Sequence, residues 1–306
     1  MIARLLQRLK PKAKSLIITI YGDSIAHRGG SAWLGSVIRL AAPLAINDRA
    51  VRSSVFRLGR EGWLEAEQVG RRSFYRLTRI GQHRVETAHG RIYHQPNRPW
   101  DGAWTLVLLG LGAKKPAGWE ALRSDLRWQG FGQIAGGVLL HPDPDPAALR
   151  QALADAGLAE QVLVMQTRAE SGPAPATVRA LVGKCWDMEQ LAADYKTFLA
   201  IFRPVWQSLD RAARLDPETC FVVRTLLMHA YRRVLLRDPK LPDELLEAGW
   251  PGVSARLLCR NLYRLIQEPA ERHLTATLET ADGTPPPADP AYGSRFGGLD
   301  AGNSDP

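Results

Sequence analysis

One stretch of the sequence, residues 47–64, carries arginines at a spacing that suits the binding of a polyanion. If this stretch is helical, with about 100° of rotation per residue, Val51, Val55 and Leu58 fall together on one side. The other side then carries Arg49, Arg52, Ser53, Phe56, Arg57 and Arg60. Arginine binds phosphate and the edge of guanine through paired hydrogen bonds. The pattern therefore predicts a helix whose apolar side lies on protein and whose basic side faces a nucleic acid.

The ends of this helix are marked by residues that begin and end helices. Asn47 suits the N-cap position, because its side chain accepts a hydrogen bond from an unpaired amide of the first turn. Asp48 places a negative charge at the positive end of the helix dipole. Gly62 provides a C-terminal exit. An ordinary surface helix with a solvated charged side stays open as an alternative, since arginine is common on surfaces.

The residues that follow favour duplex DNA as the polyanion. Residues 64–69 (LEAEQV) and 73–78 (SFYRLT) have the composition of strands, and Gly70, Arg71 and Arg72 form a basic tip between them. A helix followed by such a hairpin is typical of a winged helix-turn-helix domain. Its helix enters the major groove and its wing touches the neighbouring backbone. Arg71 and Arg72 are therefore predicted to hold phosphate. For Phe56, contact with a thymine methyl group and packing under the wing are equally open.

The preceding residues are expected to supply the other helices of this domain. Residues 15–21 and 31–42 are interpreted as its first two helices, and residues 43–46 as the turn before the basic helix. Residues 79–93 are interpreted as a helix that leaves the wing. Residues 1–13 are interpreted as a basic, mobile lead-in. The whole domain is assigned to residues 1–95.

The charge of the chain is concentrated in this N-terminal part. The 306 residues carry a net charge of +9. Residues 1–99 contain 18 basic and six acidic residues, a net charge of +12, so the remainder carries −3. A basic excess confined to one segment is the electrostatic pattern of a DNA-binding domain attached to other domains.

The rest of the chain divides at two breaker-rich segments, residues 96–102 and 170–175. Between them, the pattern of residues 101–168 predicts the element order β-α-β-β-α-β of a ferredoxin-like domain. Residues 176–280 have helical periodicity and are interpreted as a C-terminal helical domain. Residues 281–306 are rich in Pro, Gly and Asp and are expected to be mostly disordered. The predicted fold class is thus α+β and multidomain.

The sequence contains no recognisable catalytic or metal-binding motif. It has no phosphate-binding glycine loop, no HExxH and no GxSxG, and its seven histidines are scattered. We therefore expect no enzyme, cofactor or metal site. The three cysteines are far apart, which fits a reducing cytoplasm, and no apolar run is long enough to span a membrane. A basic strip in the C-terminal part is either a solvated face or a site for the phosphates of a ligand: Arg224, Arg232, Arg233 and Arg237.

Several short motifs, in order along the chain, resemble one known family. The first are YGDSIAHRGG (21–30), WLGS (33–36), REGWL (60–64) and GRRSFY (70–75). The next are WDG (100–102), WQGFG (128–132), CW (185–186) and FRP (202–204). The last are YRRVLLRDPKLPDELL (231–246), ARLLCRNLY (255–263) and RFGGL (295–299). From about residue 15 to residue 299, the chain resembles the PaaX family of repressors of bacterial phenylacetic acid catabolism.

The resemblance implies three domains, a homodimer on a palindromic operator, and phenylacetyl-CoA as the inducer that releases the DNA. It also implies that residues 295–299 dock although their flanks are loose. The central domain of the family resembles a small CRISPR-associated nuclease. Here, however, the strand AWTLVLLG (103–110) lacks the acidic residue that a metal-dependent nuclease needs at its end. The central domain is therefore expected to be a structural or dimerising spacer.

Three hypotheses follow. In the first, the chain is a repressor released by phenylacetyl-CoA. In the second, it is an enzyme, either a nuclease on the central domain or a thioesterase that acts on an acyl-CoA. In the third, it is a repressor that responds to another aryl-acyl-CoA. The missing carboxylate and the absence of a placed nucleophile and base argue against the enzyme.

Overall fold

The computed structural model describes residues 1–93, 99–109, 116–168 and 175–299. The chain divides into two compact units. Unit 1 comprises Met1–Gln95, Lys196–Arg233 and Ser254–Pro306, and unit 2 comprises Pro96–Tyr195 and Val234–Val253. Unit 1 therefore brings the N-terminal segment together with two C-terminal segments that are distant in sequence. The predicted linker at residues 170–175 falls almost wholly outside the described residues.

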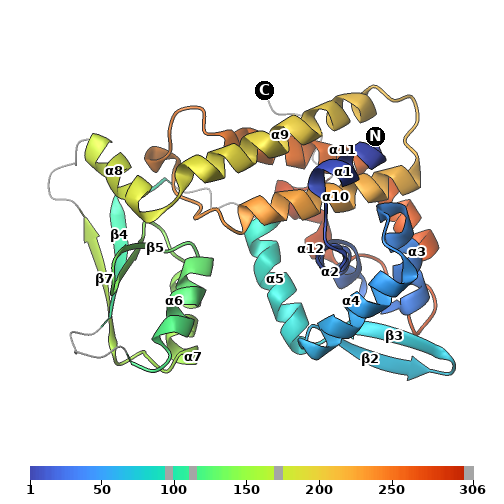
Figure 1. The fold of residues 1–306 in the computed structure, drawn as a ribbon, viewed down its shortest axis with the longest axis horizontal. Coiled ribbons are helices and arrows are strands. Elements are labelled where there is room, and N and C mark those ends of the chain that lie inside the picture. The colour runs from blue at the N-terminus through green and yellow to red at the C-terminus, as the bar shows by residue number, and fades with distance from the viewer. Residues whose placement is uncertain (94–98, 110–115, 169–174, 300–306) are drawn as a thin grey trace. The chain divides into compact units, whose positions relative to one another are not determined.

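The N-terminal part of unit 1 is a set of short helices with one small sheet (Figure 1). Its elements are α1 (Ile2–Leu9), α2 (Ala13–Thr19), η1 (Ile20–Ile25), η2 (Ala26–Arg28), β1 (Ser31–Trp33), α3 (Leu34–Ala41), η3 (Ala42–Leu44), α4 (Asp48–Arg60), β2 (Leu64–Val69), β3 (Arg72–Leu77) and α5 (Arg79–Tyr93). The strands form an antiparallel sheet in the order β1-β3-β2. The strands β2 and β3 and the helices α4 and α5 lie where the sequence predicts them.

Two predictions in this region differ from the structure. The predicted helix at residues 31–42 begins as the strand β1, because the backbone of residues 31–33 pairs with β3, with Trp33 opposite Phe74. This pairing joins residues more than forty positions apart, so helical spacing could not reveal it. Residues 1–13, expected as a mobile lead-in, contain α1, which buries Leu5.

Unit 2 contains the predicted order β-α-β-β-α-β. Its elements are β4 (Ala103–Leu109), α6 (Trp119–Trp128), β5 (Gly132–Ala135), β6 (Val138–His141), α7 (Pro146–Asp155) and β7 (Val162–Arg168). All strand pairs are antiparallel in the order β5-β6-β4-β7, which fits a ferredoxin-like fold. Val107 and Leu139 from the sheet pack with Leu122, Leu126 and Leu149 from the two helices. The Asp145 side chain caps α7 through the amides of residues 147 and 148.

The remaining elements are helical. They are α8 (Pro175–Cys185), α9 (Met188–Asp210), α10 (Pro217–Leu235), η4 (Asp243–Leu245), α11 (Pro251–Thr277), α12 (Pro290–Gly293) and η5 (Arg295–Gly297). The fold class is therefore mixed α+β, with two small sheets and many helices. None of the helices in the described residues is long and apolar enough to cross a membrane.

The end of the chain is more ordered than its composition indicates. Within the predicted disordered tail, the described residues 281–299 include the buried side chains of Tyr292, Arg295, Phe296 and Leu299. The Arg264 guanidinium donates to the carbonyl of Gly298 at 2.6 Å. Residues 300–306 lie outside the described part. Composition misleads here because a few side chains in a Pro- and Gly-rich segment bind residues that are distant in sequence.

Candidate nucleic-acid interface

Helix α4 begins and ends close to where the sequence predicts. The Asn47 Oδ1 atom accepts a hydrogen bond from the amide of Ala50 at 2.9 Å, which confirms the N-cap. Asp48 lies in the first turn, and the helix ends at Arg60. Gly62 adopts a positive φ of 72°, which suits the exit after the helix. Both ends of the helix are thus fixed by local contacts, and the direction of its side chains follows from them.

The two sides of α4 differ as predicted. Val51, Val55 and Leu58 are buried against unit 1. Ser54, also buried, donates a hydrogen bond to the carbonyl of Ala50 at 2.7 Å. All six residues of the predicted front are exposed: Arg49, Arg52, Ser53, Phe56, Arg57 and Arg60. We call these six residues the α4 front.

Phe56 is conspicuous on the α4 front because it is the largest apolar side chain there. It is 65% exposed, so packing under the hairpin is excluded in this structure. An exposed phenylalanine costs hydrophobic free energy unless a partner covers it. Contact with a thymine methyl group stays a prediction.

The arginines of the α4 front make only weak contacts with the protein. Arg52 lies 3.7 Å from the Asp48 carboxylate, and both side chains are 60% exposed. The Arg57 Nε donates to the carbonyl of Ser53 at 3.3 Å. An ion pair as exposed as that of Arg52 with Asp48 contributes little to stability. A phosphate or a base could therefore replace these contacts at little cost.

The hairpin places the two arginines of its tip in different surroundings. Gly70 has a φ of 59°, which lets the chain turn between β2 and β3. Arg71 is exposed. Arg72, at the start of β3, pairs with the Glu279 carboxylate at 2.7 Å and stacks on the Trp33 ring. Arg72 is thus exposed but already paired, which the sequence did not indicate.

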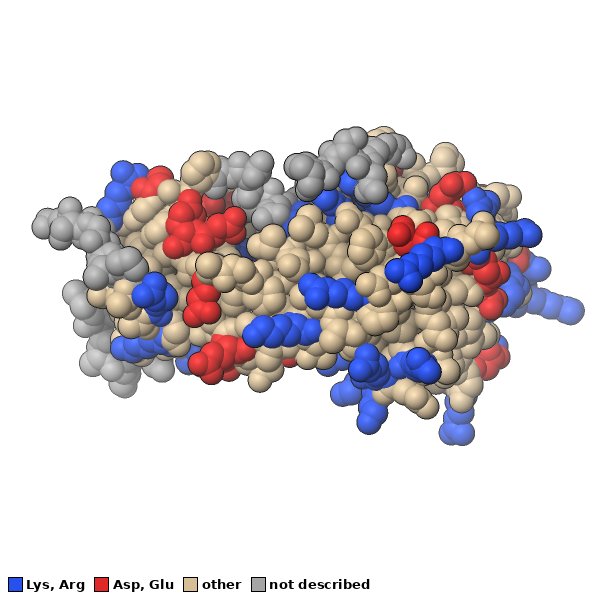
Figure 2. All heavy atoms as spheres, turned by 90° about the horizontal axis from the view of Figure 1, so that it is seen from above, with Lys and Arg blue, Asp and Glu red and all other residues tan. Residues whose placement is uncertain are grey.

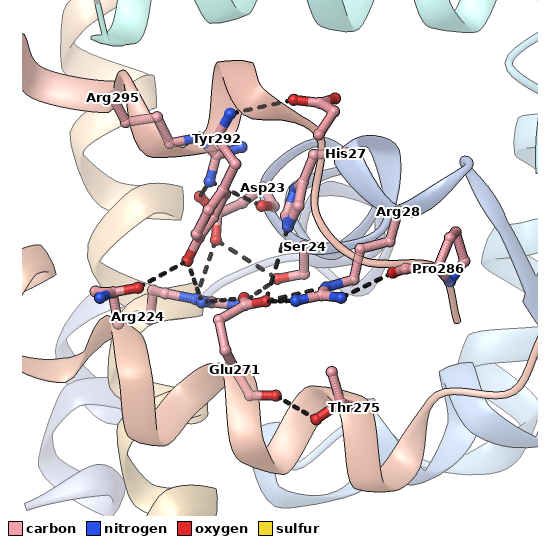
Figure 3. A network of polar contacts seen from close by, with 12 residues as sticks. Asp23, Ser24, His27, Arg28, Arg224, Glu271, Thr275, Pro286, Tyr292 and Arg295 are labelled. Atoms are coloured by element: carbon pink, nitrogen blue, oxygen red, sulfur yellow. Dashed lines mark hydrogen bonds and ion pairs between the residues drawn. The ribbon is translucent and has the colours of Figure 1, made fainter. Parts of the chain in front are cut away.

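A buried polar network ties the first residues of unit 1 to its C-terminal helices (Figure 3). Its centre is Arg224 on α10, which is 0% exposed. The Arg224 guanidinium lies 3.3 Å from the Asp23 carboxylate and donates to Glu271 at 2.6 Å and to the Ser24 hydroxyl at 3.0 Å. Glu271 also accepts two hydrogen bonds from Arg28. The network thus joins η1, η2, α10 and α11.

The C-terminal segment completes this network. Arg295 is 1% exposed and donates to the backbone carbonyl of Asp23 at 3.0 Å and to the Tyr263 hydroxyl at 2.5 Å. Its guanidinium also lies over the rings of Tyr93 and Tyr292, 4.4 and 4.5 Å from their centroids. Arg295 therefore docks the predicted RFGGL motif into the interior of unit 1.

Burial and neighbouring charges shift the pKa values of Glu271 and His27 in this network. Burial alone would raise the pKa of Glu271, but Arg224, together with the contacts from His27 and Arg28, outweighs burial and holds that pKa well below its usual value. Burial lowers the pKa of His27, whose ring stacks on Tyr292 with 4.3 Å between centroids. Two carboxylates, those of Asp23 and Glu271, balance the charges of three arginines in the network: Arg28, Arg224 and Arg295.

The predicted effector strip is not a common phosphate site in this structure. Arg224 is fully buried and ion-paired, so it cannot reach a ligand's phosphates. Arg232 is half-buried and its guanidinium donates to the hydroxyl and carbonyl of Ser15 at 3.3 and 3.4 Å. The cavity beside it has a volume of about 40 Å³, far below the roughly 300–1,000 Å³ of small-molecule pockets. Arg233 is exposed, and Arg237 pairs with Asp194 at 2.7 Å.

Helical periodicity gives the spacing of these arginines but not their environment. Asp23 and Arg295 carry no local signal of their partnership, since 272 positions separate them. Within the described residues, no group of three or more His, Cys, Asp or Glu side chains could hold a metal ion. On the face drawn in Figure 2, Lys and Arg are interspersed with acidic and uncharged residues instead of forming one continuous basic patch.

Comparison with known proteins gives matches along most of the chain. Three family models match: "PaaX-like protein" at residues 12–81, "PaaX protein central Cas2-like domain" at 97–178 and "PaaX-like protein C-terminal domain" at 186–276. The Transcriptional repressor PaaX of Escherichia coli (strain K12) is 41% identical over 286 residues, which are 93% of this chain and 90% of that protein.

A solved structure is also similar. It is the Uncharacterized protein Rv0674 from Mycobacterium tuberculosis, which matches with a TM-score of 0.50 and 25% sequence identity. The match covers 79% of this chain and 89% of that one. The likeness therefore extends well beyond any single domain.

Proposed function

The chain belongs to the PaaX family, and from this premise we propose that it represses phenylacetate degradation genes and that phenylacetyl-CoA releases it from its operator. The observation that carries the proposal is the α4 front, where four arginines, a serine and a phenylalanine are exposed together on a capped helix. The repressor activity of the similar Escherichia coli protein supports it, as does the basic charge of the N-terminal third.

In this proposal the N-terminal part of unit 1 is a winged helix-turn-helix domain. Its helices α2, α3 and α4, the strand β1 and the hairpin β2–β3 occur in the order that such a domain requires. Helix α4 enters the major groove, where Arg49, Arg52, Arg57 and Arg60 contact bases and phosphates. An arginine bound to guanine by two hydrogen bonds contributes roughly 1–3 kcal/mol of discrimination. Phe56 contacts a thymine methyl group.

Release by an inducer requires a difference in affinity. An acyl-CoA shifts the equilibrium only if it binds the free protein better than the DNA-bound protein. In a homodimer on a palindromic operator, a change in the spacing of the two α4 helices removes the contacts of one protomer. A repressor that responds to another aryl-acyl-CoA has the same mechanism and is the second candidate.

An enzymatic function has less support. The similar Escherichia coli protein is named a transcriptional repressor. The strand β4 carries no acidic residue, and Asp101, which precedes it, pairs with Arg168 at 2.5 Å. Incubation of the protein with labelled DNA, Mg²⁺ or Mn²⁺ and a CoA thioester tests this point. Turnover of either substrate would revive the enzyme hypothesis.

A gel-shift experiment tests the repressor proposal. The probe is DNA from upstream of the neighbouring catabolic genes, with and without phenylacetyl-CoA, and with phenylacetate and free CoA as controls. We expect the protein to retard the DNA, and we expect phenylacetyl-CoA, but neither control, to release it. Binding that the thioester leaves intact would remove this inducer and turn the search to other aryl-acyl-CoAs. No binding to any upstream DNA would contradict the repressor function itself.

A further inference from the structure

One carboxylate, that of Glu279, holds two arginines at the edge of the three-stranded sheet. Its Oε1 accepts from the Arg39 Nη2 and its Oε2 from the Arg72 Nη1, both at 2.7 Å. Arg39 lies on α3 and Arg72 at the start of β3. All three side chains are partly exposed, at 46%, 54% and 38% for Arg39, Arg72 and Glu279. A carboxylate that accepts one hydrogen bond from each of two arginines thus lies on the surface, next to the basic hairpin tip.

Both guanidinium groups also stack on one aromatic ring. The centroid of the Trp33 ring lies 5.0 Å from the Arg39 guanidinium carbon and 4.5 Å from that of Arg72. The ring lies over Gly35, where an added Cβ would come within 2.5 Å of it. Stacking on an aromatic face leaves the edge of a guanidinium group available for hydrogen bonds. Trp33 therefore holds two arginines in place for one anion.

Residue 279 is held at this position independently of its carboxylate. Its carbonyl accepts from the amide of Trp33 at 2.8 Å, and its amide donates to the Ser36 hydroxyl at 3.0 Å. Arg39 also donates to the carbonyl of Thr277 at 2.9 Å, which is the last residue of α11. The carboxylate is consequently not needed to bring the chain to the sheet, and its effect is on the two arginines.

We propose that Arg39 and Arg72, stacked on Trp33, form a binding site for a DNA backbone phosphate, and that Glu279 occupies this site until the DNA displaces it. The inference rests on the proposed function, because it adds a phosphate contact to the DNA-binding domain proposed there. A phosphodiester presents two oxygens to the arginines as a carboxylate does. Exposed ion pairs contribute little each, so the exchange costs little.

The arrangement also gives α11 an influence on DNA affinity. Glu279 follows the last residue of α11 by two positions, and α11 carries Glu271 in the buried network. Contacts that hold this end of α11 against the sheet keep the Glu279 carboxylate in competition with DNA for the two arginines. A change that moves this end of α11 away from the sheet leaves both arginines available to a phosphate.

The experiment measures the affinity of the full chain for a labelled random-sequence duplex over a series of salt concentrations. A random sequence suffices because contacts to phosphate carry no sequence information. Glu279→Gln removes the charge and leaves the backbone bonds, and its affinity should rise roughly two- to thirtyfold. Arg39→Gln/Arg72→Gln should lower the affinity and reduce the salt slope by about 0.9, the value for one phosphate. Glu279→Gln should have no effect in an Arg39→Gln/Arg72→Gln background.

Glu268→Gln is the matched control, because it removes an exposed carboxylate whose ion pair lies within α11, with Arg272 at 2.6 Å. It should change neither affinity nor slope. A thermal melt of each variant separates loss of fold from loss of contact. If Glu279→Gln binds DNA no more tightly than Glu268→Gln, or if Arg39→Gln/Arg72→Gln keeps the wild-type salt slope, the site is overturned while the operator experiment above stands. If the wild-type chain binds neither the random-sequence duplex nor the upstream DNA, the proposed function and the proposed site fail together.

Discussion

Arginine has opposite roles in two regions of unit 1. On the α4 front, Arg52 and Arg57 make one weak contact each and extend into solvent. In the buried network, Arg224 and Arg295 direct their guanidinium groups at carboxylates, carbonyls and hydroxyls of the protein itself. The residue type is the same in both regions. What differs is whether residues from distant parts of the chain surround the side chain.

This difference predicts that the two sets of arginines respond oppositely to mutation. A buried charge that loses its partner has no solvent to compensate it. An exposed arginine can be lost with little effect on folding but removes a contact to an external ligand. Stability should therefore depend on the network, and DNA binding on the α4 front.

The largest expected effect is that of Arg224→Gln. The change leaves Asp23 and Glu271 with one positive partner fewer in the interior, and should lower the free energy of unfolding by roughly 3–5 kcal/mol. A thermal melt should show a midpoint lower by roughly 6–20 °C, if unit 1 melts like a domain of ordinary size. Arg60→Gln, the same change on the α4 front, is the control. Equal midpoints for the two variants would contradict the comparison.

The next effect concerns the pH dependence of stability through His229 on α10. Burial, followed by the nearby Arg232 and Arg233, lowers the pKa of His229 to about 4. An unfolded histidine titrates near 6.5. Between about pH 6.5 and 4 the unfolded state binds a proton that the folded state does not, so stability falls as the pH falls. The loss from this residue should be roughly 3 kcal/mol.

Thermal melts across that pH range compare the wild type with His229→Gln, which should show a smaller loss on acidification. The exposed His83 supplies the matched control, His83→Gln. If both variants follow the wild-type pH profile, His229 is not protected from protonation, and the interior is less closed than the network implies.

On the α4 front, a smaller change is expected, and it is in the free energy of DNA binding and not in that of unfolding. Arg57→Ala should weaken binding to the operator roughly five- to 150-fold, the range for one lost pair of hydrogen bonds to a base. Its melting midpoint should match that of the wild type. Arg211→Ala, an exposed arginine that follows α9, should leave both unchanged. Fluorescence anisotropy with labelled operator DNA measures the affinities.

The smallest effect is expected at the hairpin tip. Arg71 is exposed there and is proposed to hold a phosphate. Arg71→Ala should weaken binding to all sequences alike and reduce the salt slope by about 0.9. Titrations of two unrelated duplexes at several salt concentrations check this. A loss confined to one of the duplexes would mean that Arg71 contacts bases.

The sequence predicted the α4 front well because local chemistry determines it. The Asn47 cap fixes the start of the helix, and the alternation of Val51, Val55 and Leu58 with arginines fixes its faces. The element order of the central domain was predicted for the same reason, since each strand and helix has its own pattern and turn residues. These features need no information from distant residues.

The buried network could not be predicted in this way. Asp23, Arg224, Glu271 and Arg295 meet only after the chain has folded, and their separations along the sequence reach 272 positions. Arg224 therefore resembled a solvated or ligand-binding arginine. The pairing of Arg72 with Glu279 was missed for the same reason, because the two residues lie 207 positions apart. The matched motifs at residues 21–30 and 295–299 were the only signal that both segments matter.

The most direct test of the account is the base preference of the α4 front. Wild-type protein and Arg52→Ala are each used to select duplexes from a randomised pool, and the selected sequences are compared. The wild type should select a palindrome, and Arg52→Ala should lose its preference at particular base pairs in each half-site while keeping the others. An unchanged preference in Arg52→Ala would show that this face of α4 does not read DNA.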